Sequence, residues 1–359
     1  MRFLLKHFNI LSFSDKVLYL LKNLKPSRMK LLIIVLLGLS SLMVSSQNIK
    51  QNASIIVNDP ILNKVISEKE SIEILAEGFE WTEGPLWLEG ENKLIFSDIP
   101  NNSIFEWTEK GGKKLWLKPA GYTGFIEREG EPGSNGLLLS PEGKLVLCQH
   151  GDRRMAVMRT NLSNPKPDFE TLAEQYKGKR FNSPNDAAYH KNGDLYFTDP
   201  PYGLERNIND PAKELDYQGV YRLDKNGKVT LLTKELSQPN GIAFSPDFKK
   251  LYVANSDPEK AIWMIYDVTK NGLLKNGKVF FDVTDKVGKL KGLPDGMKVH
   301  PNGWIFATGP GGVLIFTPDG KHLGTVMTGE ATANCAFNFD QSVLFMTADD
   351  YLLSIKLKR

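Results

Sequence analysis

Six polar residues recur along the chain at positions where their side chains could bind one metal ion. They are Glu83, Asn135, Asn185, Asn240, Asp295 and Asn334, separated by 52, 50, 55, 55 and 39 residues. The set offers two carboxylates and four amides, with no Cys or His. Such oxygen donors suit a hard cation, and Ca²⁺ tolerates loose geometry with many oxygen ligands. We expect one divalent cation, Ca²⁺ first, with Zn²⁺, Mg²⁺ and Mn²⁺ as alternatives.

Each of the six residues opens a similar segment, in which an apolar strand, a turn and a second apolar strand follow one another. The turns include SPEG at 140–143, KNGD at 191–194 and HPNG at 300–303, whose Pro, Asn and Gly suit hairpins. Further strand candidates lie at 219–223 and 229–232, which makes four strands per unit. The repeat therefore predicts an all-β fold, a six-bladed β-propeller with four-stranded blades and a central metal site.

The ends of the repeat region predict how the ring closes. A strand candidate at 71–75 precedes the first unit, and another at 351–356 follows the last. We expect the two to pair within one blade. No long amphipathic helix is evident after residue 70, which disfavours a helical bundle or a doubly wound fold.

In a propeller the first strands of the blades surround the axis, so equivalent positions converge at one end of the channel. Asn-Gly and Asp-Gly are also common turn dipeptides, but ordinary turns need not repeat the polar residue in phase six times. Hairpin geometry returns the second strand to the same face. A pocket for a polar substrate is therefore predicted, with five candidate substrate-binding residues: Asn135, His150, Arg153, Asp199 and Tyr202.

The amino-terminal segment predicts export. Residues 1–46 carry seven Lys or Arg and one acid, a net +6, and an apolar run occupies 31–44. Fourteen helical residues would rise about 21 Å, short of the roughly 30 Å hydrocarbon core. We expect a signal peptide region at 1–46, with Met29 as a possible start, and a periplasmic or secreted protein. A retained single-span anchor is the alternative. A polar leader at 47–70 and a propeller at 71–359 would follow.

Composition and charge limit the partners. The chain has 359 residues, 41% of them hydrophobic, which is typical of a globular protein. Because the net charge is +3, residues 47–359 carry 3 − 6 = −3, which gives no electrostatic footprint for nucleic acid. Cys148 and Cys335 show no Cys-x-x-Cys spacing, and we expect both to be free and buried. The sequence sets no oligomeric state.

Four motifs occur together in the order of a known family. They are EGPLW at 83–87, NSPND at 182–186, PNG at 239–241 and PDGM at 294–297. The chain resembles the gluconolactonase, senescence marker protein and luciferin-regenerating enzyme family over roughly residues 72–357. The resemblance implies a six-bladed propeller with one divalent metal, usually Ca²⁺. By motif, Glu83, Asn240 and Asp295 resemble its direct metal ligands, and Asn185 resembles a fourth metal-site residue that contacts the metal or its bound water. Asp295 also resembles its general base, and Asn185 its substrate-contacting asparagine; either Asn182 or Asn185 matches that position, but Asn185 alone is in phase.

The resemblance implies metal-dependent hydrolysis of a sugar-type lactone to the hydroxy acid. Three alternatives stay open: another hydrolase of the superfamily, such as a phosphotriesterase; an exported quinone-dependent sugar dehydrogenase, for which His150 is the only plausible cofactor residue; and a non-enzymatic binding propeller. Charged residues at the axis argue against the last, because a binding surface on the loops does not need them.

Overall fold

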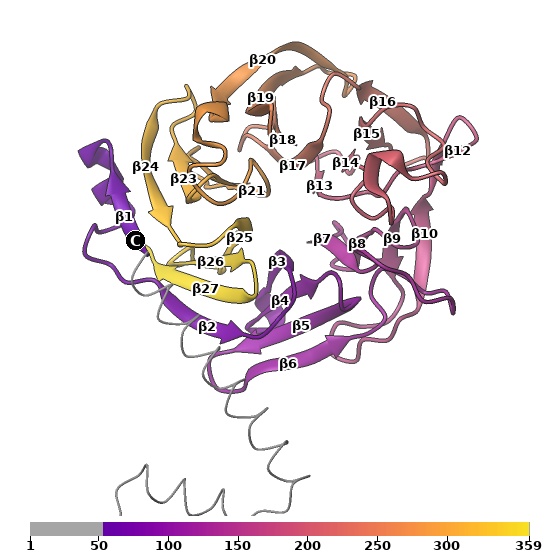
Figure 1. The fold of residues 1–359 in the computed structure, drawn as a ribbon, viewed down its shortest axis with the longest axis horizontal. Helices are drawn as coiled ribbons and strands as arrows, with labels where there is room; N and C mark the ends of the chain where they lie inside the picture. The colour runs from indigo at the N-terminus through magenta and orange to yellow at the C-terminus, as the bar shows by residue number, and fades with distance from the viewer. Residues whose placement is uncertain (1–52, 359) are drawn as a thin grey trace, which may run out of the picture. The chain divides into compact units, whose positions relative to one another are not determined.

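The computed structural model describes residues 53–358. The predicted signal region lies outside the described residues. Within them, six antiparallel sheets follow one another around a ring, and a two-stranded hairpin joins β11 (Gln175–Tyr176) to β12 (Lys179–Arg180). Figure 1 shows inner strands such as β3, β7, β17 and β25 around the centre and outer strands such as β6, β16 and β20 at the periphery. The six-bladed fold predicted from the repeat is confirmed.

Each blade is built on four strands, to which blade five adds a fifth, and their order runs from the innermost strand outward. Blade one is β3 (Thr82–Leu88), β4 (Lys93–Asp98), β5 (Ser103–Thr108) and β6 (Gly112–Leu117). Blade two is β7 (Ser134–Leu139), β8 (Leu145–Gln149), β9 (Arg154–Met158) and β10 (Phe169–Ala173). Blade three is β13 (Ala187–Tyr189), β14 (Leu195–Asp199), β15 (Gly219–Leu223) and β16 (Val229–Thr233).

The other three blades continue in chain order. Blade four is β17 (Pro239–Phe244), β18 (Lys250–Asp257), β19 (Lys260–Val268) and β20 (Leu274–Asp282). Blade five is β21 (Met297–Val299), β22 (Ile305–Gly309), β23 (Gly312–Phe316) and β24 (His322–Met327). Blade six is β25 (Thr332–Phe337), β26 (Val343–Ala348), β27 (Tyr351–Lys356) and β2 (Glu73–Glu77).

The ring closes by pairing its two ends. Strand β2 runs antiparallel to β27, with Glu73 opposite Ser354 and Glu77 opposite Tyr351. This is the predicted closure, with the amino-terminal strand two residues later than 71–75. The neighbouring blade faces add an apolar seal, because Trp87 of blade one stacks on Phe345 of blade six with ring centroids 5.5 Å apart. Hydrogen bonding and packing together join the last blade to the first.

Part of the segment expected as a polar leader has regular structure. Strand β1 (Ser54–Val57) adds a fifth, outermost strand to blade five by pairing with β24. A 3₁₀ helix, η1 (Pro60–Lys64), follows it, and Leu62 and Ile66 are fully buried. The apolar residues of this segment therefore pack against the body of the propeller. Three shorter 3₁₀ helices are η2 (Glu89–Glu91), η3 (Asn207–Asn209) and η4 (Thr284–Lys286).

The core consists of apolar layers between successive blades. One layer joins blades four and five, for example, through Trp263, Tyr252 and Phe316. Cys148 and Cys335 are free and buried, as predicted. The predicted hairpin turns also form, and Gly143 and Gly193 take φ values of +78° and +89°, which glycine adopts without strain. None of the helices in residues 53–358 is long and apolar enough to cross a membrane.

Candidate active site

Five of the six phased residues line one cavity at the end of the central channel. The cavity has a volume of about 430 Å³, and Glu83, Asn135, Asn185, Asn240 and Asp295 all contribute to its wall. Each lies at or just before the start of an inner strand, and the first four are at most 4% exposed. The structure thus brings these five residues together around one cavity.

The inner strands share a local irregularity that aims these side chains inward. The pairing register of β3, β7 and β17 with its neighbour shifts just after Glu83, Ser134 and Pro239 respectively, and β25 shifts near Asn334. A β-bulge adds a residue to one strand and turns its side chain away from the regular alternation. In blades one, two and four the recurring shift explains why the polar residue faces the cavity, whereas in blade six Asn334 contacts Glu83 of the neighbouring blade.

The glycine after the polar residue allows the inner strands to approach one another. A Cβ at Gly84 would lie 2.1 Å from the carbonyl oxygen of Asn135, and one at Gly241 would lie 2.2 Å from that of Asp295. Gly136 shows the same relation to Asn185, whose carbonyl oxygen it reaches by a 2.8 Å hydrogen bond from its amide. In blades one, two and four, the glycine therefore brings the next polar residue to the axis.

Three fully buried oxygens that line the cavity have no hydrogen-bond partner within residues 53–358: Oδ1 of Asn135, of Asn185 and of Asp295. Other contacts orient the amides. Nδ2 of Asn185 lies 3.5 Å from Nε2 of His150, and Nδ2 of Asn240 donates to Oγ of Ser256 at 3.0 Å. Buried polar atoms are normally paired. Unpaired oxygens that line a common cavity therefore fit a bound cation.

Burial favours the protonated forms of the Glu83 and Asp295 carboxyls. The pKa of Glu83 is raised to about 7, chiefly by burial, against hydrogen bonds from the Gly84 amide and from Nδ2 of Asn334. The pKa of Asp295 is raised well above its ordinary value by burial and then by the nearby charge of Glu83. Both shifts come from removing like charges from water. A divalent cation between these groups would offset that cost.

Among the described residues, no group of three or more His, Cys, Asp or Glu side chains is placed to hold a metal ion. The ring has only two carboxylates, and its remaining donors are amides. The sixth phased residue, Asn334, does not line the cavity. Its Nδ2 instead donates to Oε2 of Glu83 at 3.1 Å and so supports that cavity-lining carboxyl.

Three of the predicted substrate-binding residues do not line the cavity. Nε of Arg153 donates to the carbonyl oxygens of Phe181 and Asn182 at 2.8 and 3.1 Å. The carboxylate of Asp199 accepts from the amides of Asn182 and Ser183, and burial raises its pKa to about 7. The predicted place of Arg153 and Asp199 in the substrate pocket is therefore corrected. Both side chains hydrogen-bond to the backbone of the segment that leads to Asn185.

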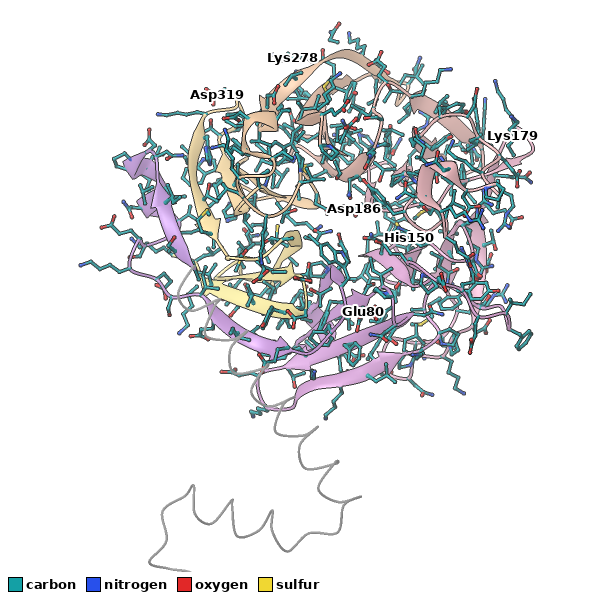
Figure 2. All side chains as sticks on the ribbon, viewed as in Figure 1. Glu80, His150, Lys179, Asp186, Lys278 and Asp319 are labelled. Carbon is teal, nitrogen blue, oxygen red and sulfur yellow. The ribbon has the colours of Figure 1, made fainter. Side chains whose placement is uncertain are left out.

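His150 is the third correction, because it is fully buried behind the wall. Its Nε2 faces Asn185 and its Nδ1 lies 3.2 Å from Oε2 of Glu131, so it supports the amide of Asn185. Figure 2 shows His150 and Asp186 on the inner side of the ring. Asn182 likewise does not line the cavity, and its Nδ2 donates to the carbonyl oxygens of Asp199 and Tyr217. The placement supports Asn185 as the in-phase asparagine.

Tyr202 does line the cavity, as predicted, and its hydroxyl donates to Oε1 of Gln238 at 3.0 Å. Sequence reasoning missed the polar lining residues Glu131, Gln238 and Ser256. Glu131 and Gln238 sit in the loops just ahead of Asn135 and Asn240. Their nearness to the phased residues was the available signal. Asp186, next to Asn185, was also missed; burial raises its pKa, and its Oδ2 has no partner within the described residues.

The remaining wall of the cavity is largely apolar. It consists of Trp81, Pro258, Val287, Gly288, Leu290, Gly292, Leu293, Ala331 and Thr332. Most of these residues come from the loop between β20 and β21 or from the beginnings of blades six and one. No repeat or motif marked residues 287–293 of this loop.

Comparisons with known proteins agree with the fold. Residues 81–349 match the family described as the SMP-30/Gluconolactonase/LRE-like region. The chain is 39% identical over 310 residues to a gluconolactonase of Zymomonas mobilis subsp. mobilis, covering 83% of this chain and 85% of that protein. A solved gluconolactonase structure from Xanthomonas campestris superposes with a TM-score of 0.72 at 29% identity, covering 85% of this chain and 96% of that one. A calcium-binding regucalcin from Agrobacterium tumefaciens shares the fold, with a TM-score of 0.62 at 21% identity and coverage of 80% and 95%.

Proposed function

Because the chain belongs to the SMP-30/gluconolactonase/LRE-like family, we propose that it is a lactonase that uses one divalent metal to hydrolyse a sugar-type lactone to the hydroxy acid. The gluconolactonases it resembles support this activity. One structural observation carries the proposal: unpaired oxygens of Asn135, Asn185 and Asp295 line the same cavity as the Glu83 carboxyl. This arrangement favours an enzyme over a binding propeller, because it concentrates costly buried polar groups at one point.

Glu83, Asn185, Asn240 and Asp295 would hold the metal. Hard oxygen donors suit Ca²⁺, and the likeness to a calcium-binding regucalcin points to the same ion. When bound, a divalent cation polarises the lactone carbonyl and stabilises negative charge on its oxygen. His150 keeps the Nδ2 side of Asn185 occupied, so the amide oxygen remains directed to the cavity. Ser256 does the same for Asn240.

Asp295 would act as the general base. Its carboxylate accepts a proton from water while the water oxygen bonds to the carbonyl carbon. The ring C–O bond then breaks, and the proton passes to the departing ring oxygen, which leaves a hydroxyl and a carboxylic acid. Asn135 and Tyr202 would orient the substrate through hydrogen bonds from the polar side of the cavity.

The proposed function includes export from the cytoplasm, for which the apolar run at 31–44 with its basic flank is the support. Fractionation and amino-terminal sequencing of the protein from its host should find a mature chain that begins near Gln47. An intact chain recovered from the cytosol would contradict export and leave the activity proposal unaffected.

A substrate panel tests the activity. Purified protein loaded with Ca²⁺ should open aldonolactones faster than the uncatalysed reaction, and chelation should abolish the excess rate. The same preparation is then given a phosphotriester, and separately an aldose with pyrroloquinoline quinone and an electron acceptor. Turnover of either in place of lactones would replace the lactonase assignment, and binding without turnover of any substrate would indicate a non-enzymatic propeller.

A further inference from the structure

The cavity is divided into a polar and an apolar side, and the division follows the order of the blades. Polar lining residues come from blades two to four and the loops ahead of them: Glu131, Asn135, Asn185, Tyr202, Gln238, Asn240 and Ser256. The apolar ones come mainly from the loop between β20 and β21 and from the starts of blades six and one, joined by Pro258 of blade four. Glu83 and Asp295 belong to the blades that carry the apolar side.

The loop at 283–296 supplies the centre of the apolar side. Val287 and Leu293 pack against the apolar layer between blades four and five, which fixes their position. Leu290 remains 38% exposed at the cavity wall. The amides of Val287 and Leu290 donate within the loop, to the carbonyl oxygens of Thr284 and Lys286. These backbone donors are therefore already used.

Two polar side chains beside this wall, those of Thr332 and Lys291, are also occupied. Thr332 is the one polar side chain among the residues of the apolar side, and its Oγ1 lies 2.7 Å from that of Thr328. The ammonium of Lys291 pairs with Glu330. A fully hydroxylated lactone would place hydroxyl groups against aliphatic carbons, where each lost hydrogen bond weakens binding roughly tenfold. An aromatic ring such as Trp81 can stack on a sugar, but branched aliphatic side chains offer no such contact.

We propose that this wall is a subsite for a hydrocarbon substituent on the lactone. The preferred substrate is then an amphipathic lactone, whose ring ester and oxygen substituents face the polar side while an alkyl or aryl group contacts Val287, Leu290 and Leu293. The inference rests on the proposed lactonase function and narrows its substrate class. It predicts that an apolar substituent increases kcat/KM.

The test compares a series of δ-lactones with alkyl groups of increasing length at the carbon beside the ring oxygen, together with glucono-δ-lactone, on the Ca²⁺-loaded protein. Burying a methylene is worth roughly a twofold to fourfold gain, so kcat/KM should rise by about that factor per methylene until the wall is covered. L290S should flatten the rise. L115S is the matched control, because Leu115 is 57% exposed on outer strand β6 and does not line the cavity.

A second readout separates this inference from the activity. Binding of 3-alkylcyclohexanones, which place the alkyl group at the corresponding position but lack the cleavable ester, is measured by calorimetry with the same variants. A series that tightens with chain length in the wild type and in L115S but not in L290S supports the subsite, whether or not lactones are hydrolysed. Rapid hydrolysis of glucono-δ-lactone with flat alkyl series in both assays would overturn the subsite and leave the lactonase intact. Absence of lactone hydrolysis with a rising binding series would overturn the activity alone.

Discussion

At the scale of single residues, the site depends on two carboxyls that differ in their expected tasks. Glu83 is buried, and its carboxylate accepts bonds from Gly84 and Asn334. Asp295 lines the same cavity, and its Oδ1 has no partner within residues 53–358. Glu83 is thus held by the protein, whereas an oxygen of Asp295 remains available to metal or water.

Substitution should separate the two tasks. D295N and E83Q each remove one formal charge, so both variants should bind Ca²⁺ more weakly. Raising Ca²⁺ should restore most of the activity of E83Q. D295N should stay lower by roughly 10² to 10⁴ in rate at saturating metal, because it also lacks the base. Initial rates measured across a Ca²⁺ titration check this, and equal recovery of both variants would leave Asp295 as a ligand only.

Protons should compete with the cation. In the metal-free protein the pKa of Glu83 is raised from 4.5 to about 7, and that of Asp295 is also raised. The folded state thus binds these protons more tightly than the unfolded chain does. For Glu83, the free energy of unfolding of the metal-free protein therefore falls as the pH rises from 4.5 to about 7. Ca²⁺ binding must displace the protons, so its affinity should fall below about pH 7 by up to tenfold per pH unit for each proton displaced.

Calorimetric Ca²⁺ titrations at about pH 5.5 and about pH 8.5 measure this competition. Two buffers with different ionisation enthalpies report the protons released, and the E83Q/D295N double variant serves as the control without titrating carboxyls. Equal affinity of the wild type at both pH values would contradict the account.

Much of the site could be predicted, because their equivalent positions in the repeat identified the five phased residues that line the cavity. The roles of His150, Arg153 and Asp199 could not, because a polar residue at the correct end of a blade either faces the cavity or supports the wall. That difference depends on side-chain packing. Arg153 reaches the carbonyls that precede Asn185 and so is buried in the wall.

At the scale of elements, the inner strand is the unit that builds the site. In sequence, the glycine that follows the phased polar residue could belong to a turn. In the structure this glycine lies in the inner strand or just ahead of it, and it faces the next blade. Blades three and six depart from the pattern, since Asp186 follows Asn185 and Cys335 follows Asn334 there. The repeat could predict four strands per blade, whereas the close approach between blades involves residues about fifty positions apart and carries no local signal.

Removing that close approach should disturb the metal site. G241A would place a Cβ 2.2 Å from the carbonyl oxygen of Asp295, and nothing lies within 4 Å of a Cβ at Gly90. G241A should therefore cost about 1–3 kcal/mol in the free energy of unfolding and weaken Ca²⁺ binding, while G90A should change neither. Denaturant unfolding and Ca²⁺ titration of the two variants provide the measurement. Wild-type Ca²⁺ affinity in G241A would show that the contact does not position Asp295.

At the scale of the whole molecule, the ring is sealed where β2 meets β27. The sequence predicted this pairing because strand candidates flank the repeat. It did not predict β1 or the apolar residues of the segment 287–293, because neither belongs to the repeated unit. The repeated strands could thus be predicted from the sequence, whereas the added strand β1 and the apolar part of the cavity wall could not.

Removing the strand that closes the propeller should destabilise the fold more than removing the outermost strand of blade five. Deleting residues 350–359 removes β27, which pairs with both β26 and β2, so cooperative unfolding should be lost. Deleting residues 1–57 removes β1 from the outer edge of blade five but leaves the closure intact. That variant should melt cooperatively at a moderately lower temperature. Calorimetric melts of both compare them, and similar transitions would show that the closure does not hold the fold together.

The central claim is that one divalent cation at the axis makes this propeller a lactonase. Stripping the protein with a chelator and titrating Ca²⁺ back while following glucono-δ-lactone opening above the uncatalysed rate tests it most directly. The account predicts negligible activity without metal and a linear rise that saturates at one Ca²⁺ per chain. Full activity in the stripped, metal-free protein would contradict it.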